Sequence, residues 1–451
     1  MLDFNKNIYT NLLFQILIFT FCCFSEIPLP QLPIIPNYNR IPIGQIEASE
    51  AGAYVARASG ITASWYNPAG LGLTQSFALN ASYTGIEIMK FKLQDFPNSL
   101  RSVAFDVTPG FLGVVARLPL KSSKSVSLSL SQPALWRPGF DAISQIDNRF
   151  LRLAVFNDVY FTTYYPAISA GLLNSNNLRI GLGIIFPYTS FDVKQSISGH
   201  QNSAEPFNYL LSFQTNATAV HLGVSAGVQY RLTDDIQIGA MLRSPGIRLY
   251  RNAWIYYDLL KINNDSSISI SVIDSNAIFE YKQPAMFSAG VALIKRNWSI
   301  ELDLNIYQGF GKYTLLRSNE EAIIGRLNSD EEMTNSAQSF PEYFYDNKLV
   351  INAAFGGDYR ITKHLSLQSG FCTDFSPVQQ DNSNAFRSIN LYNITFGIST
   401  GFKNFTGAIG TRFNFGSSDS YLIGEALLPE PVKTRLIFRS FSFIWAITLG
   451  S

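Results

Sequence analysis

The sequence predicts an all-β protein, a transmembrane antiparallel β-barrel, and three observations predict it. Apolar and polar residues alternate with a period of two from about residue 75 almost to the end of the chain, as in strands whose two faces meet different surroundings. Hydrophobic residues make up 47% of the 451 residues, yet past the N-terminus no apolar run reaches the length of a transmembrane helix, roughly 20 residues. The polar residues of the alternation are mostly Ser, Gly, Asn and Thr, whereas a soluble β-sandwich would need an exposed face rich in Lys and Glu. We therefore expect a barrel in a membrane.

Residues 1–25 are predicted to be a secretory signal peptide. Lys6 precedes an apolar stretch, and Cys23-Phe24-Ser25 has the small-x-small pattern of a cleavage site. A lipoprotein with its lipid on Cys22 is the alternative, but the bulky Phe21 stands where a small residue is wanted. Cleavage would leave Cys372 alone in the mature chain, so no intramolecular disulfide is expected.

Residues 26–73 are predicted to be an N-terminal extension that precedes the barrel. Its first part, EIPLPQLPIIPNYNRIPIG, holds five prolines, which exclude a helix interior or a central strand. The part that follows is rich in Gly and Ala and too short to form a core of its own. We expect it to pack against something larger.

Residues 74–451 are predicted to form the barrel. In SVSLSLS, Val126, Leu128 and Leu130 alternate with serines, and the last strand places five apolar residues on one face: Phe441, Phe443, Trp445, Ile447 and Leu449. At roughly 25 residues per strand with its connection, the region holds roughly 14 to 16 strands, an even number being expected. Short turns are expected at 232–235, 295–297, 361–363 and 402–404, and a long polar loop at 312–347. Such an asymmetry of rims is typical of outer-membrane barrels.

One segment and several strands resemble a known family. The run AGAYVARASGITASWYNPAGLGL, with Asn67-Pro68-Ala69 near its end, resembles the N-terminal signature of the FadL/TodX family of outer-membrane transporters of long-chain fatty acids and hydrophobic compounds. Similar strands follow, such as LRIGLGIIFPY and FGGDYRITKHLSLQSGFCTDFSPV. The resemblance implies a fourteen-stranded barrel whose lumen is plugged by a small N-terminal hatch. It also implies a bacterial outer-membrane location and passive uptake of compounds such as long-chain fatty acids or aromatic hydrocarbons, without a cofactor.

The resemblance suggests two functional positions. Asn67, Pro68 and Ala69 would form a hatch turn that contacts the wall and gates the path, although Asn before Pro also favours a simple turn. Pro133 is the candidate for an interruption of the wall through which cargo leaves sideways, because proline removes a donor from the strand ladder. The alternative is that Pro133 merely ends its strand. The family often has an acidic residue before the Ala-Ser step, but here Ile61-Thr62 stands there, which argues against a salt bridge inside the hatch.

Other classes of function find little support. The 34 basic and 33 acidic residues leave a net charge of +1, so a nucleic-acid partner is not expected. Two G-x-S-x-G matches, 223–227 and 397–401, lie inside alternating strands rather than at a strand-turn-helix elbow, and the three histidines are scattered. We expect no enzyme, no metal and no cofactor. The expected partners are membrane lipid, lipopolysaccharide and a hydrophobic small molecule, and the barrel is expected to be a monomer. The alternatives are a FadL-like barrel that serves as a protein-interaction or secretion-system scaffold, and a general porin.

Overall fold

The computed structural model describes residues 37–41, 43–74, 77–93, 103–117, 124–136, 139–146, 151–175, 177–201, 207–264, 266–327, 333–379, 388–421 and 433–450. The signal peptide expected at 1–25 and most of the proline-rich stretch lie outside these residues. Among the described residues, no helix is both long enough and apolar enough to cross a membrane.

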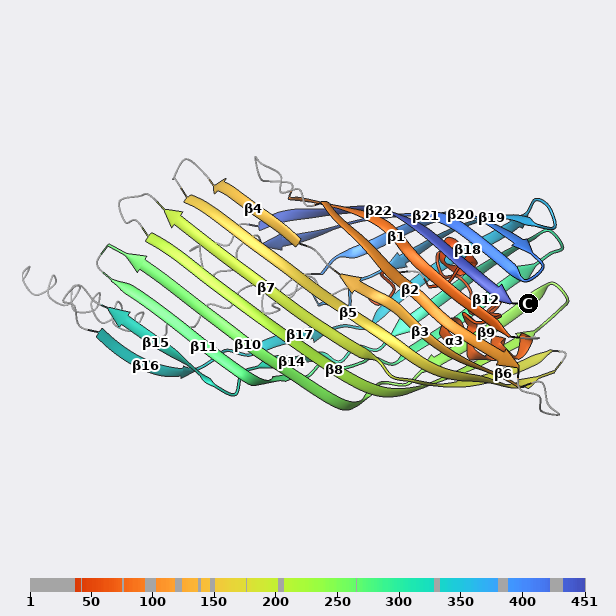
Figure 1. The fold of residues 1–451 in the computed structure, drawn as a ribbon, viewed down its shortest axis with the longest axis horizontal. Helices are drawn as coiled ribbons and strands as arrows, with labels where there is room; N and C mark the ends of the chain where they lie inside the picture. The colour runs from red at the N-terminus through yellow and green to blue at the C-terminus, as the bar shows by residue number, and fades with distance from the viewer. Residues whose placement is uncertain are drawn as a thin grey trace, which may run out of the picture.

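The chain folds into one antiparallel sheet that closes on itself as a barrel (Figure 1). Its strands are β1 (Ala78–Leu93), β2 (Val103–Arg117), β3 (Ser125–Trp136), β4 (Gly139–Ile146), β5 (Leu151–Asn174), β6 (Leu178–Ile185), β7 (Tyr188–Gln201), β8 (Phe207–Arg231), β9 (Ile236–Arg243), β10 (Ile247–Asn263), β11 (Ser267–Phe279), β12 (Met286–Ile294), β13 (Trp298–Tyr307), β14 (Gly311–Arg317), β15 (Glu321–Leu327), β16 (Met333–Ser339), β17 (Tyr343–Asn347), β18 (Val350–Arg360), β19 (Leu365–Asp374), β20 (Asn390–Phe402), β21 (Phe405–Tyr421) and β22 (Lys433–Gly450). Several consecutive strands share one place in the wall, among them β6 with β7, β9 with β10 and β17 with β18. The barrel therefore has 14 strands, as the resemblance implied.

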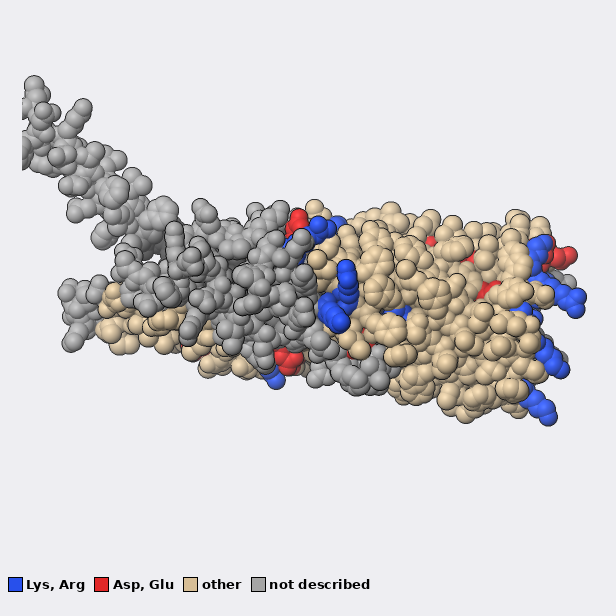
Figure 2. All heavy atoms as spheres, turned by 90° about the horizontal axis from the view of Figure 1, so that it is seen from above, with Lys and Arg blue, Asp and Glu red and all other residues tan. Residues whose placement is uncertain are grey.

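The alternation in the sequence separates the inside of the barrel from the outside. In β3 the serines at 125, 127 and 129 are buried, whereas Leu128 is 57% exposed on the outer face. The outer faces of the other strands carry exposed large apolar residues in the same way, among them Ile168, Leu182, Val224, Leu242, Val291, Leu302, Phe355, Phe396 and Phe443. Figure 2 shows the resulting band, with few charges on it and with Lys and Arg gathered at one end. A band of this kind suits the hydrocarbon core of a bilayer.

The two rims of the barrel differ. Short turns join β8 to β9, β12 to β13, β18 to β19 and β20 to β21, all at the end where the chain terminates (Figure 1). The stretch 312–347, expected as a long polar loop, is instead mostly strand. There β14 and β17 pair with each other and continue the wall, while β15 and β16 form a hairpin that extends from β11. The prediction was wrong because backbone pairing, of β14 with β17 and of β15 with β11 and β16, makes strands of short segments that lack a regular alternation.

The polarity of the wall reverses along the longest strand, β8. Close to the short-turn rim its inward residues are polar or glycine, namely His221, Gly223, Ser225, Gly227 and Gln229, and its outward residues are apolar. Farther from that rim the inward residues are apolar or small, among them Tyr209, Leu211, Phe213, Ala217 and Ala219, and the outward ones are mostly polar. The outer surroundings of the strand thus change from lipid to water. The lumen changes in the opposite sense, from polar to apolar.

Candidate functional site

The N-terminal residues 37–41 and 43–74, which we call the hatch segment, lie inside the barrel near the short-turn rim (Figure 1). Their regular elements are short: α2 (Ile46–Ser49), α3 (Ala63–Tyr66) and the 3-10 helix η1 (Pro68–Leu73). Many apolar residues of the segment pack in one cluster with Phe111 and Val115 of β2, namely Ile43, Ala58, Ile61, Ala63, Tyr66 and Leu71. The segment therefore uses the wall as part of its core, as its composition predicted.

Glycines in the wall let the backbone of the hatch segment approach closely. At each of these positions an added Cβ would lie within 3.0 Å of the segment's own atoms: Gly171, Gly181, Gly227, Gly239, Gly356, Gly370 and Gly397. Two of them, Gly227 and Gly397, belong to the G-x-S-x-G matches. Those matches therefore mark contacts with the hatch segment inside strands, and the strand-turn-helix context of a nucleophile elbow is absent from both.

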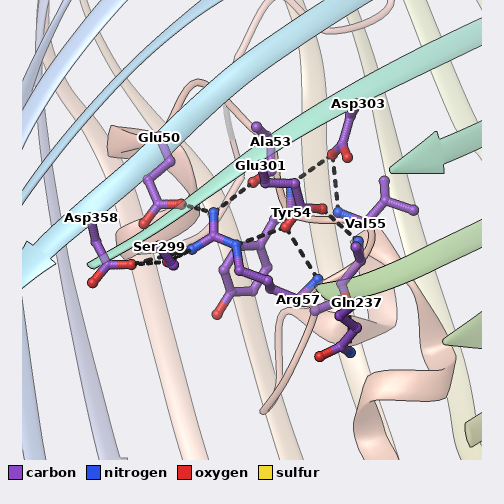
Figure 3. Close-up of polar contacts among 12 residues, drawn as sticks. Glu50, Ala53, Tyr54, Val55, Arg57, Gln237, Ser299, Glu301, Asp303 and Asp358 are labelled. Carbon is purple, nitrogen blue, oxygen red and sulfur yellow. Dashed lines mark hydrogen bonds and ion pairs between the residues drawn. The ribbon is translucent and has the colours of Figure 1, made fainter. Parts of the chain in front are cut away.

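Two carboxylates of β13 bind the hatch backbone (Figure 3). Asp303 accepts hydrogen bonds from the backbone N–H groups of Tyr54 and Val55, at 2.7 and 3.0 Å. Glu301 accepts from those of Ala56 and Arg57, at 2.5 and 3.2 Å. Four consecutive backbone donors of the hatch segment are thus satisfied by one strand of the wall. Charged acceptors make such bonds stronger than neutral ones.

The guanidinium of Arg57 joins these carboxylates to others (Figure 3). It forms ion pairs with Glu301 at 2.8 Å and with Asp358 of β18 at 3.3 Å, and a third with Glu50. Glu50 belongs to the hatch segment itself, so the expectation that the hatch lacks a salt bridge was wrong. The acidic residue of this salt bridge is Glu50, seven residues before Arg57. It is not a residue directly before Ala63-Ser64, where the family often has one.

One cation among several carboxylates affects their protonation. Burial raises the pKa of Glu50 to about 8, because the loss of solvation outweighs the attraction of Arg57 and Asp358 adds repulsion. Burial alone would lower the pKa of Arg57, but Glu50 and Glu301 outweigh it and the pKa is raised. The pKa of Arg57 is thus shifted towards the charged form, whereas Glu50 binds a proton more readily than an ordinary carboxyl does.

Asn67 connects the hatch segment to two strands of the wall. Its side-chain amide donates to the carbonyl of Val55 at 3.0 Å, of Val228 in β8 at 3.0 Å and of Ala240 in β9 at 3.3 Å. Its side-chain oxygen accepts from the backbone N–H of Ala69 and so caps η1. Asn67-Pro68-Ala69 therefore lies where the chain turns into η1, and the side chain of Asn67 also contacts the wall.

Pro133 lies within β3 and not at its end. The pairing of β3 with β5 shifts register between Ser131 and Ala134 and then resumes. The carbonyl of Pro133 points inward and accepts a hydrogen bond from the backbone N–H of Ile41 at 2.8 Å. Neighbouring β1 and β2 also shift register, between Ser82 and Tyr83 and again after Thr84. Irregular pairing thus affects adjacent strands of the wall.

Above the hatch segment the lumen is lined by an apolar cluster, which we call the apolar chamber. It is a cluster of packed side chains, mainly from β5, β7, β8, β10, β11, β14, β15 and β17, that includes Phe161, Phe191, Phe213, Tyr257, Val272, Phe279, Tyr281, Leu316, Phe340, Tyr343 and Tyr345. The rings of Phe191 and Phe279 stack with centroids 6.1 Å apart. This chamber could not be inferred from the sequence, because its residues come from many strands. The sequence does not say which part of one strand lies beside which part of its neighbour.

Trp65 packs the hatch segment against the wall beside Tyr165. The Trp65 ring lies edge-on to Tyr165 of β5 at 5.2 Å, and the guanidinium of Arg243 stacks on it at 3.6 Å. A cavity of about 40 Å³ lies between the hatch segment and the wall near Trp65, which is enough for a few water molecules.

Sequence reasoning missed Arg57, Glu301 and Asp303 as site residues. A signal was present, because Glu301 and Asp303 alternate with apolar residues and thus face the lumen together. Among the described residues, no group of His, Cys, Asp and Glu is arranged to hold a metal ion. His221 is buried and bonds the carbonyl of Tyr281, and Cys372 packs against Ala51 and Ala53 of the hatch segment.

No family model and no curated protein matches the sequence, but solved structures match the fold. A Pseudomonas aeruginosa FadL homologue is 14% identical, with a TM-score of 0.63 over 92% of this chain and 99% of that one. The P. putida toluene transporter TodX is 14% identical, with a TM-score of 0.58 over 91% and 99%. The Ralstonia pickettii toluene transporter TbuX is 13% identical, with a TM-score of 0.55 over 92% and 99%. The chain therefore has the FadL/TodX fold.

Proposed function

We propose that the protein is a bacterial outer-membrane channel for the passive uptake of hydrophobic small molecules, such as long-chain fatty acids or aromatic hydrocarbons. The observation that carries the proposal is the apolar chamber above the hatch segment. A hydrophobic molecule gains about 0.8 kcal/mol for each CH₂ group that it buries, whereas an open aqueous pore offers it nothing. The similar structures described as FadL and toluene transporters support the same class of cargo.

The proposed route leads from the chamber sideways through the wall near Pro133. The pairing of Ser131 with Tyr165, of Tyr164 with Tyr188 and of Tyr188 with Val220 places Pro133 level with the point where β8 changes polarity. At this level the inward residues of β8 change from polar to apolar or small, and its outward residues change from apolar to polar. Exit there would spare the cargo a passage through the polar lumen around the hatch segment.

Uptake of a radiolabelled long-chain fatty acid and of toluene tests the proposal, in Gram-negative cells that lack their own channel. The double variant Phe191→Gln, Phe279→Gln should lose most binding and uptake, because it places two amides in the chamber. The control is Ile273→Gln, which changes an outward residue of β11 that is 72% exposed. If the double variant transports as well as the control does, the chamber does not carry the cargo.

A second variant separates binding from exit. Pro133→Val would supply the missing ladder donor, and it should slow uptake while leaving the affinity for a fluorescent fatty acid unchanged. Unchanged uptake would exclude exit at this point. Cells that take up both compounds equally well without the protein, but secrete less protein, would favour the scaffold alternative.

The general porin is less well supported than the channel for hydrophobic cargo. A porin needs an open polar path along the barrel, but the hatch segment lies inside the barrel near the short-turn rim and packs against the wall (Figure 1). The same uptake assay with a small sugar distinguishes the two functions, because a porin would admit the sugar at least as readily as the fatty acid.

A further inference from the structure

The outer wall of the barrel has a groove on its lipid-facing side, apart from the chamber and from Pro133. It runs across β13, β18, β19, β20, β21 and β22 and has a volume of about 1140 Å³. Its lining is almost entirely apolar and includes Trp298, Phe355, Tyr359, Phe371, Phe396 and Trp445. Figure 2 views the barrel from the side where β19 to β22 lie along the upper edge of Figure 1.

The groove has a cause in the sequence. Two small outward residues, Gly357 of β18 and Ser369 of β19, are directly paired. The pairs on either side of them along the strands are large, Phe355 with Phe371 and Tyr359 with Leu367. Across the strands the row continues with Ile300 on one side and Phe396 on the other. Small residues thus form the floor and aromatic or branched residues form the walls.

The rim directly below the groove is basic. The turns that end its strands carry Arg296, Arg360, Lys363 and Lys403, all exposed. Backbone hydrogen bonds join these turns side by side, from Arg360 to Asn297 and from Gly401 to His364. Among the described residues, none of these four cations forms an ion pair. Lys295 is different, because Asp235 pairs with it at 2.5 Å.

We propose that this groove is a binding site for an anionic glycerophospholipid, with an acyl chain over Gly357 and Ser369 and the phosphate among the cations of the rim. The basic rim favours a lipid with an anionic headgroup, whereas an apolar groove alone would accept any acyl chain. The site rests on the proposed outer-membrane location, because the short turns of such barrels lie on the periplasmic side, where the inner leaflet presents phospholipid. Lipopolysaccharide would require the opposite rim.

The wall offers a matched comparison. Ala240 of β9 and Ala289 of β12 also form a pair of small outward residues, and Ala240 lies about as far from its turn as Ser369 does from the cations. The turn below Ala240 carries Asp234 and Asp235 instead of free cations. The two positions thus share the shape of the wall and differ in the charge of the rim.

Native mass spectrometry of the mature protein tests the proposal, after reconstitution in nanodiscs with equal amounts of phosphatidylglycerol and phosphatidylcholine. Wild type should retain one phosphatidylglycerol, at least several-fold more often than phosphatidylcholine. Ser369→Trp should lose the adduct because it fills the floor, whereas Ala240→Trp should keep it. The triple variant Arg360→Gln, Lys363→Gln, Lys403→Gln should remove the preference while Arg231→Gln, a cation elsewhere on the same rim, should not.

A heat-modifiable gel shift shows that each variant is folded, and the charge variants change no residue that lines the groove. Equal retention of the two lipids, or an adduct that is unchanged in either Ser369→Trp or the triple variant, would overturn the proposal. Uptake of hydrophobic cargo does not enter this readout. Failure of the lipid site and failure of the transport proposal therefore remain distinguishable.

Discussion

Asn67 is the residue whose side chain does most to hold the end of the hatch segment against the wall. Asn67→Ala removes three donated hydrogen bonds and the cap of η1. Each buried carbonyl left without a donor costs roughly 1–3 kcal/mol. We expect hydrogen exchange in residues 63–74 to accelerate at least tenfold. Asn404→Ala, at the exposed turn between β20 and β21, is the control and should leave exchange in the segment unchanged.

Glu50 gives the hatch segment a pH dependence. Burial raises its pKa from the ordinary 4.5 to about 8, so the segment binds a proton that the free carboxyl would release. The stability from this proton is fully present below about pH 4.5 and is lost as the pH rises through about 8. The groups that face Glu50 are Arg57, Asp358 and Glu47.

Glu50→Gln should therefore hold the segment equally well at pH 6 and pH 9, whereas wild type should loosen at the higher pH. Exchange protection of residues 46–58, corrected for intrinsic rates, measures the difference. A wild type that is as well protected at pH 9 as at pH 6 would show that Arg57 keeps Glu50 ionised throughout.

At the residue scale, the sequence predicted the position of the Asn67 turn but not its partners. The same holds for Arg57, whose carboxylates come from positions 50, 301 and 358. Those positions meet only when β13 and β18 become neighbours in the closed wall. The alternation of the sequence tells whether a side chain points into the lumen or outward. It does not tell which side chains of other strands lie next to it.

At the scale of elements, the strands and the hatch segment fit through the wall glycines. Gly370→Ala should displace the segment, because the new Cβ would meet the backbone of Glu50 and Ala51, which cannot move as a flexible side chain can. Gly401→Ala is the matched control, with no atom closer than 3.7 Å to its Cβ. Limited proteolysis from the short-turn side should cut the hatch segment of the first variant faster and leave the second like wild type. Equal cleavage of the two would mean that the segment does not depend on this contact.

Strands were predictable from the sequence where one face is apolar and the other face is polar or small. The alternation in β3, β8, β13 and β22 placed those strands and their outer faces correctly. It failed at 312–347, where the strands are short and the alternation is irregular, and where all residues of β16 are exposed. A strand held mainly by backbone pairing with β15 leaves no periodic trace in the sequence.

At the scale of the whole molecule, the wall closes by its own ladder and does not need the hatch segment. Deletion of residues 37–74 should therefore leave a heat-modifiable barrel with an unchanged β-sheet spectrum, because β1 still pairs with β2 and β22. The lumen near the short-turn rim would then be open and polar. A deletion variant that no longer migrates as a folded barrel would show that the segment serves as a template for the wall.

The seam between β1 and β22 has a consequence for assembly. It joins Ala78 to Gly450, so the circle is completed only when the last strand of the chain arrives, and this pairing spans the longest loop in the molecule. The hatch segment directly precedes the first strand. The strand that follows the enclosed segment in the sequence is therefore the same strand that must find the last one before the segment is enclosed.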